Sequence, residues 1–145
     1  MKKAILTGVL SVFTIGFLLA QTGVEELPKS AKEYIEQQFP TENITFVEKD
    51  KDLMLWNNED MYEVHFSSGL EVVFNEAGEV TEIDAAKDQE IPLEALPSTI
   101  VSYVDTNYKE TGIKSWEVDG KDQDVELTNG VDLEFDKNGK FLRVD

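Results

Sequence analysis

The sequence predicts an α+β protein made of two tandem repeats, each with one helix packed on an antiparallel sheet of about four strands. Two observations predict this fold. A segment of three short strands, residues 62–84, recurs as residues 123–145, and an amphipathic helix opened by Leu-Pro precedes each copy. The apolar stripe of each helix and the apolar face of each sheet are most simply buried against each other.

The second copy of the strand segment shows the pattern most clearly. Val125 and Leu127 alternate with acidic and polar residues, and the alternation resumes at Val131 after Asn129-Gly130. Successive side chains of a strand point to opposite faces, so one face is apolar and the other acidic. Because directly opposed residues share a face, we expect Leu127 opposite Val131, with a three-residue loop that ends at Gly130.

The remaining turns follow the same logic. Phe135 is expected opposite Phe141, with Gly139 as the last residue of the loop between them, and Gly69 and Gly78 occupy the matching positions of the first copy. The last strand of each copy breaks the strict alternation, which predicts a β-bulge there.

Two helices are expected, one between Pro28 and Phe39 and one between Pro97 and Gly112. Proline suits the first turn of a helix, the residue before a proline avoids helical dihedrals, and glycine is a common terminator. After each helix comes one more expected strand, at residues 44–48 and 113–118.

The N-terminal residues 1–20 have the pattern of a secretory signal peptide: two lysines, an apolar stretch and a small residue, Ala20. The alternative is a retained anchor, but the stretch is shorter than the ~20 apolar residues that a membrane span prefers. We therefore expect a periplasmic or secreted protein with no membrane insertion after cleavage. Its mature part, residues 21–145, is expected to be a single domain of two repeats, residues 27–84 and 96–145.

The composition excludes several classes of site. The 145 residues carry a formal net charge of −17 and contain no cysteine. Disulfides, thiol catalysis and cysteine metal sites are thereby excluded. The acidic charge argues against binding to nucleic acid or to anionic lipid, since both require a basic surface.

The pattern of the two copies resembles that of the PepSY-like, or putative β-lactamase-inhibitor-like, periplasmic proteins. The residues that carry the resemblance are Leu27-Pro28, Phe39, Ile44, Tyr62, Val64, Gly69, Leu70–Phe74 and Gly78, and they recur as Leu96-Pro97, Tyr108, Ile113, Val125, Gly130, Val131–Phe135 and Gly139. The second copy departs from the family at Gln123, where tyrosine is common. The resemblance implies tandem helix-plus-sheet repeats like those of β-lactamase inhibitor proteins, and it carries no catalytic motif.

The single histidine, His65, is expected on the outward face near Glu63 and opposite Glu71. It lacks a nucleophile and a second histidine at metal-ligand spacing, so we interpret it as a solvated surface residue. No catalytic, cofactor-binding or metal-binding residue is predicted. Two oxygen-rich runs, residues 119–124 and 136–139, do not fit a calcium loop and predict at most weak, adventitious calcium binding.

Two features are candidates for binding a partner. The first copy contains an eight-residue insertion between residues 49 and 58, because the helices recur after 69 residues and the strand segments after 61. Its apolar residues either extend a buried strand or form an exposed contact, and the outward acidic residues of the second copy either aid solubility or attract a basic partner. The candidate residues are Leu53, Met54, Leu55, Trp56, Glu126, Asp132 and Glu134.

These observations favour a non-enzymatic binding module that contacts an unidentified protein partner, in an inhibitor-like or other binding role. The alternative is a small-ligand or envelope-sensing binding protein, which would need an apolar pocket between the repeats. A small metal-dependent hydrolase ranks last, since the sequence shows no convergent set of activated polar groups.

Overall fold

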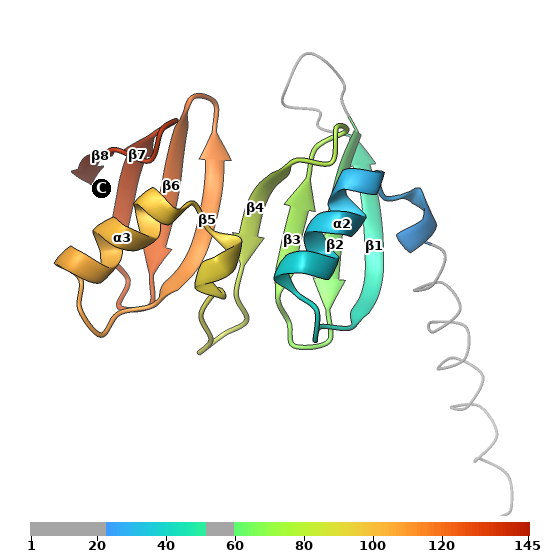
Figure 1. Ribbon diagram of the computed structural model, residues 1–145, viewed down its shortest axis with the longest axis horizontal. Coiled ribbons are helices and arrows are strands. Elements are labelled where there is room, and N and C mark those ends of the chain that lie inside the picture. Colours follow the sequence, from blue (N-terminus) through green and yellow to red (C-terminus); the bar gives the residue numbers. More distant parts are fainter. Residues whose placement is uncertain (1–22, 52–59) are drawn as a thin grey trace, which may run out of the picture.

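The computed structural model describes residues 23–51 and 60–145 and has the expected α+β architecture. Both longer helices lie against the same face of one sheet, α2 over the first strands and α3 over the last ones (Figure 1). The elements in chain order are η1 (Val24–Glu26), α2 (Lys29–Gln38), β1 (Ile44–Lys51), β2 (Asp60–Phe66), β3 (Glu71–Phe74), β4 (Val80–Asp84), η2 (Leu93–Ala95), α3 (Ser98–Asn107), β5 (Ile113–Asp119), β6 (Asp122–Leu127), β7 (Asp132–Asp136) and β8 (Phe141–Val144).

The eight strands form one continuous sheet in the order of the sequence, and each strand pairs antiparallel with the next. The sequence predicts an antiparallel sheet of about four strands for each helix, and in the structure all of these strands belong to one sheet. Strands β4 and β5 join across the middle, where Ile83 pairs with Trp116 and Glu82 with Glu117. The junction is favourable because two exposed sheet edges, with their unpaired backbone groups, are satisfied by each other.

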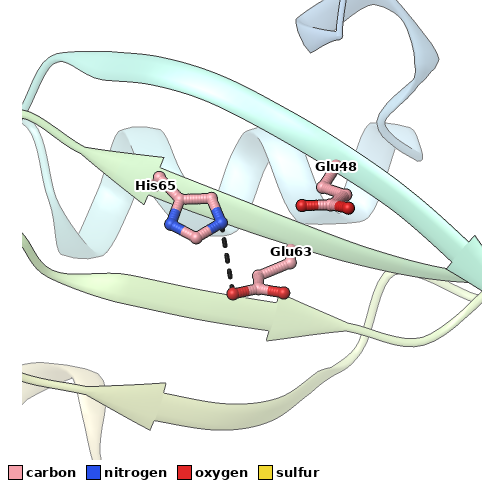
Figure 2. A group of neighbouring side chains, drawn as sticks. All are labelled: Glu48, Glu63 and His65. Carbon is pink, nitrogen blue, oxygen red and sulfur yellow. Dashed lines mark ion pairs between the residues drawn. The ribbon is translucent and has the colours of Figure 1, made fainter.

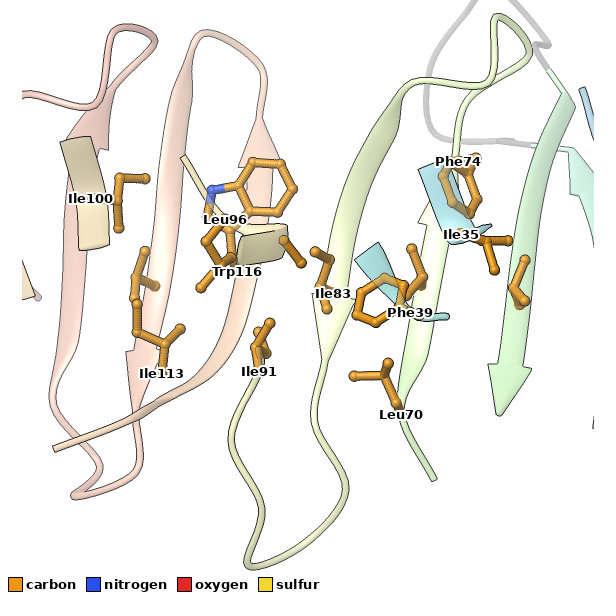
Figure 3. Packing of buried hydrophobic residues seen from close by; sticks show 14 of the residues in the cluster. Ile35, Phe39, Leu70, Phe74, Ile83, Ile91, Leu96, Ile100, Ile113 and Trp116 are labelled. Carbon is orange, nitrogen blue, oxygen red and sulfur yellow. The ribbon is translucent and has the colours of Figure 1, made fainter. Parts of the chain in front are cut away.

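The core lies between the helices and the sheet. Tyr34 of α2 meets the ring of Phe74 edge-on with centroids 5.8 Å apart, and Tyr103 of α3 meets Phe135 in the same way at 5.4 Å. Edge-on aromatic pairs add to the stabilisation that burial itself provides. The buried residues continue across the middle of the sheet through Ile83, Ile91 and Trp116, so the core residues of the described part of the chain form one apolar cluster (Figure 3).

The predicted hairpins are confirmed. The backbone N–H of Leu127 donates to the carbonyl of Val131 over 2.9 Å, and Gly130 adopts a left-handed φ of +80°. Phe135 pairs with Phe141 as expected. The register shifts next to Phe74 and Phe135, which confirms a bulge at the last strand of each copy.

One detail of the sequence prediction is corrected, and the orientation of Trp116 is now defined. Helix α3 ends at Asn107 and not at Gly112, because Tyr108 already has non-helical dihedrals although its N–H still donates to Val104. Trp116 and Ile113 lie on the same buried face, where a regular strand would separate them. A register shift between Ile113 and Ser115 turns Trp116 inward, and its side chain is only 4% exposed.

The candidate contact residues 53–56 lie outside the residues that the structure describes. Within the described residues, no helix combines the length and the hydropathy needed to cross a membrane.

Candidate functional site

The face of the sheet that no helix covers is strongly acidic between β4 and β7. We call this group of outward side chains the acidic face. It consists of Glu82, Asp84, Glu117, Asp124, Glu126, Asp132 and Glu134. Each alternates along its strand with a buried apolar residue such as Ile83, Trp116 or Val125. The alternation that builds the core on one side therefore builds the acidic face on the other.

The strand register places carboxylates directly opposite one another. Glu82 pairs with Glu117, and Glu117 pairs in turn with Asp124. Asp124 then pairs with Glu134, which completes a row of acidic residues across four strands. Like charges at directly opposed positions destabilise a sheet, so the fold retains an electrostatic cost along this row.

The pKa values along the row reflect this crowding. Burial, followed by a hydrogen bond with Asp84 and the charges of Asp84, Glu117 and Glu63, raises the pKa of Glu82 to about 7. Burial and nearby carboxylates, Asp119 first among them, also raise the pKa values of Glu117 and Asp124. The centre of the acidic face thus holds protons more tightly than ordinary carboxylates do, and at Asp124 the charge of Arg143 offsets only part of this effect.

The three acidic residues predicted as partner contacts do lie on this face, but in different surroundings. Asp132 is exposed, whereas Glu126 forms an ion pair with Lys114 over 2.8 Å. Glu134 pairs with Arg143, and its side chain is only 13% exposed. The least compensated charge therefore lies nearer the middle of the sheet, at Glu82, Glu117 and Asp124.

A shallow hollow of about 250 Å³ lies in the acidic face. Its lining residues are Ser115, Glu117, Asp124, Val125, Glu126, Asp132, Leu133 and Asp145.

The oxygen-rich run at residues 136–139 forms the turn between β7 and β8, and its carboxylate is engaged in hydrogen bonds within that turn. The carboxylate of Asp136 accepts the N–H groups of Asn138 and Lys140 over 2.8 and 2.9 Å, and these bonds lower its pKa.

A second cluster lies on the same open face over β1 and β2. Figure 2 shows Glu48, Glu63 and His65 on the side of the sheet away from α2. Glu48 pairs directly with Glu63, and one possible ligand atom from each of the three residues lies within 4.8 Å of the other two. Together with Glu71, which is opposite His65 on β3, these residues form what we call the histidine cluster.

His65 is outward and opposite Glu71, as the sequence predicts, but it is not solvated. Its side chain is only 17% exposed. The ring of Phe46, paired with it across β1, stacks on the imidazole with centroids 3.9 Å apart and an angle of 16° between the planes. The prediction of a solvated histidine is therefore wrong, because a neighbouring strand supplies an aromatic cover.

A larger hollow of about 1060 Å³ lies beside the turn between β6 and β7. It is lined by polar and charged residues, namely Lys87, Asp88, Gln89, Glu90, Lys114, Glu126, Thr128, Asn129 and Gly130. This lining is not the apolar pocket that a carrier of apolar ligands requires.

Some of these residues could have been found from the sequence. Asp124 lies at an outward position of an alternating pattern, which is the same signal that identified Glu126 and Asp132. Glu117 is outward only because the register shifts between Ile113 and Ser115, which the alternation does not reveal. The approach of Glu48 and Phe46 to His65 depends on the register between β1 and β2, which a bulge near Ile44 shifts. Local sequence patterns carry no signal for that register.

Known structures resemble the chain over most of its length. Two proteins of Bacteroides vulgatus, each described as a "putative periplasmic protein" and one of them as of unknown function, are 29% and 31% identical to it, each with a TM-score of 0.75. The matches cover 84% of this chain and 92% and 94% of theirs. A protein of Bacteroides thetaiotaomicron, described as a "putative calcium-regulated periplasmic protein", is 30% identical, with a TM-score of 0.75 over 84% of this chain and 92% of that one.

No curated protein matches the sequence. The periplasmic neighbours agree with the expected location, and the protein is periplasmic or secreted. The family model described as "Putative beta-lactamase-inhibitor-like, PepSY-like" matches residues 21–56 and 60–143, which is most of the sequence. The resemblance seen in the sequence is thereby confirmed, and the chain belongs to this PepSY-like family.

Proposed function

We propose that the protein is a non-catalytic binding module that acts outside the cytoplasm, after removal of residues 1–20 as a signal peptide, and presents its acidic face to a basic surface of a protein partner. The observation that carries the proposal is the row of directly opposed carboxylates from Glu82 to Glu134. An inhibitor-like role would be one form of such binding. The apolar residues 53–56 remain a proposed second contact.

The electrostatics of the face support a basic partner. Burial first and then neighbouring carboxylates raise the pKa values of Glu82 and Asp124, and a positive group that approaches them offsets both the loss of solvation and the repulsion. Complementary charge also accelerates encounter and disfavours acidic partners. Both longer helices lie on the opposite side of the sheet, so they leave this face open to a protein partner (Figure 1).

The proposal is tested by capturing partners from periplasmic extract on the immobilised protein and on a variant with Glu117→Gln, Asp124→Asn and Asp132→Asn. We expect the specific partner to be retained by the natural protein and to be lost from the variant. Retention should also fall between about 0.05 and 0.5 M salt, because exposed charges are screened over that range.

A matched variant controls for net charge. Glu36, Glu94 and Asp105 are exposed residues away from the acidic face. Replacing them by their amides removes three negative charges, the same number as in the first variant. This control should retain the partner. The proposal is contradicted if both variants lose the partner equally or if both retain it equally.

We also infer that the fold consists of two tandem copies of one unit. Helices α2 and α3 begin 69 residues apart, at Lys29 and Ser98, and also end 69 residues apart. The bulged register between β1 and β2 is repeated between β5 and β6, where Ser115 takes the place of Phe46. Repetition of helix bounds and of an irregular register supports duplication of a whole unit.

Calcium binding at the hollow of the acidic face is a second candidate function. It is favoured by the similarity to the protein described as calcium-regulated and by the carboxylates that line the hollow. Calcium at about 1 mM should raise the melting temperature of the natural protein. The same addition should have less effect on the variant with Asp124→Asn and Glu126→Gln. If the natural protein melts at the same temperature with calcium as with a chelator, this function is ruled out.

A further inference from the structure

We propose that Glu48, Glu63 and His65 of the histidine cluster form a binding site for a divalent transition-metal ion, with zinc as the ion that best fits the donor set. The three side chains come from two adjacent strands and converge on the open face of the sheet (Figure 2). The site is separate from the acidic face and does not depend on the proposed partner.

Glu71 prepares the imidazole for metal binding. Its Oε1 atom lies 3.1 Å from Nδ1 of His65, and an ionised carboxylate can only accept a hydrogen bond. Nδ1 therefore carries the proton, and in the neutral ring Nε2 presents its lone pair. A carboxylate that holds the non-ligating nitrogen is the usual outer-shell support of a metal-binding histidine, because it fixes both the tautomer and the orientation of the ring.

The Nε2 atom faces an electron-rich surrounding. It is shielded from solvent and, within the described part of the chain, has no hydrogen-bond partner. Oε1 of Glu63 lies 3.1 Å away, close enough for an ion pair but not aligned for a hydrogen bond. A lone pair and a carboxylate oxygen at this separation repel each other unless a proton or a metal cation lies between them, and a metal ion can bind both atoms at once.

The distances suit zinc. Two donor atoms bound to one zinc ion at about 2.0–2.1 Å, with a near-tetrahedral angle, lie roughly 3.3 Å apart. The observed separation of 3.1 Å between Nε2 of His65 and Oε1 of Glu63 is close to that value. The carboxylate of Glu48, within 4.8 Å of the other donor atoms, is exposed and free to turn toward the ion. Three protein ligands leave the fourth position of a tetrahedral zinc ion to a water molecule.

The donor types select the class of metal. An imidazole nitrogen suits zinc, copper, iron and nickel, whereas calcium and magnesium prefer oxygen ligands. The second half of the sheet provides an internal comparison at the same registers. There, Glu117, Asp124 and Glu126 stand where Glu48, Glu63 and His65 stand in the first half, so the matching position offers only carboxylates. A preference for transition metals should therefore belong to the first half alone.

The test uses zinc chloride and the purified protein, free of any histidine tag and of bound metal after dialysis against a chelator. His65 is the only histidine in the sequence, so its ring signals in NMR report on the site without ambiguity. We expect zinc to shift these signals with the metal on Nε2. Calorimetry should show one zinc ion bound per chain through this site, and calcium should leave the ring signals in place.

Three variants complete the experiment. His65→Asn should weaken zinc binding by at least about tenfold, and Glu71→Gln by about 10–100-fold through loss of the outer-shell support. Glu126→Gln, at the position matching His65, should leave zinc affinity within about twofold. If zinc leaves the ring signals of the natural protein unmoved, or if Glu126→Gln weakens binding as much as His65→Asn does, the assignment is wrong. If a variant fails to fold, the NMR titration of the natural protein with zinc still tests the proposal.

Discussion

At the scale of single residues, Glu82 shows how burial and like charge combine. In the folded chain, burial and its hydrogen bond with Asp84 raise the pKa of Glu82 from 4.5 to about 7. The folded state therefore disfavours the ionised carboxyl. The contribution of this group to stability is fully present below pH 4.5 and is lost as the pH rises through about 7.

Replacing Glu82 by glutamine should remove the loss of stability that occurs as the pH rises, because glutamine does not ionise. Glutamine keeps the shape of the protonated carboxyl and can still donate to Asp84. We expect Glu82→Gln to raise the free energy of unfolding at about pH 8 by about 1 kcal/mol, a value reduced from the full pKa effect because the half-buried group is screened by solvent. At about pH 4 the two proteins should be equally stable. Urea titrations at both pH values measure the difference, and an equal gain at both would refute the explanation.

Gln123 shows why one residue departs from the family pattern. It is buried, and its Oε1 atom accepts the indole N–H of Trp116 over 3.0 Å while its amide donates to the carbonyl of Asp136 over 2.9 Å. A buried indole N–H requires an acceptor. The sequence marked Gln123 as a departure, but the reason appears only once Trp116 is known to lie in the core.

At the scale of elements, two turns with the same backbone differ in what surrounds them. Gly78 and Gly130 both have left-handed φ values, +77° and +80°. A Cβ atom at Gly130 would meet nothing within 4 Å, whereas at Gly78 it would lie 2.8 Å from Cβ of Pro28 and would also collide with Ser30 Oγ. That hydroxyl donates to the carbonyl of Ala77 over 2.7 Å and ties α2 to the turn.

The two alanine substitutions should therefore have different costs. Gly130→Ala should lose about 1–2 kcal/mol of stability from backbone strain alone. Gly78→Ala should lose about 1–3 kcal/mol more, because α2 must also move to relieve the overlap. Denaturant unfolding of both variants tests this, and equal losses would show that the turn at Gly78 does not hold the helix.

The success of the sequence prediction also varies by element. The hairpin between Leu127 and Val131 was predictable because alternation and turn chemistry are both local. The end of α3 was not, since Gly112 is an attractive terminator while Tyr108 leaves the helix earlier. The histidine cluster was missed for a different reason: Phe46 and Glu48 reach His65 only through the pairing of β1 with β2. Residues 53–56 remain a prediction.

At the scale of the whole molecule, one sheet separates two kinds of surface. Its covered side holds the apolar cluster that extends beneath both helices, and its open side concentrates carboxylates over the middle strands. The predicted repeat indicated both faces, because a period of two sorts residues by side. It did not indicate that β4 and β5 would join, since the pairing of two edges depends on how the halves meet.

The order of the strands also bears on how the chain acquires its structure after export. Every strand pairs with its neighbour in the sequence, from β1 to β8. Each strand can therefore pair with the strand that precedes it in the sequence, and no pairing requires a segment from the far end of the chain. Local pairing of this kind keeps the entropy of loop closure low and favours rapid folding. A chain that reaches the periplasm N-terminus first could thus assemble its sheet in the order in which it emerges.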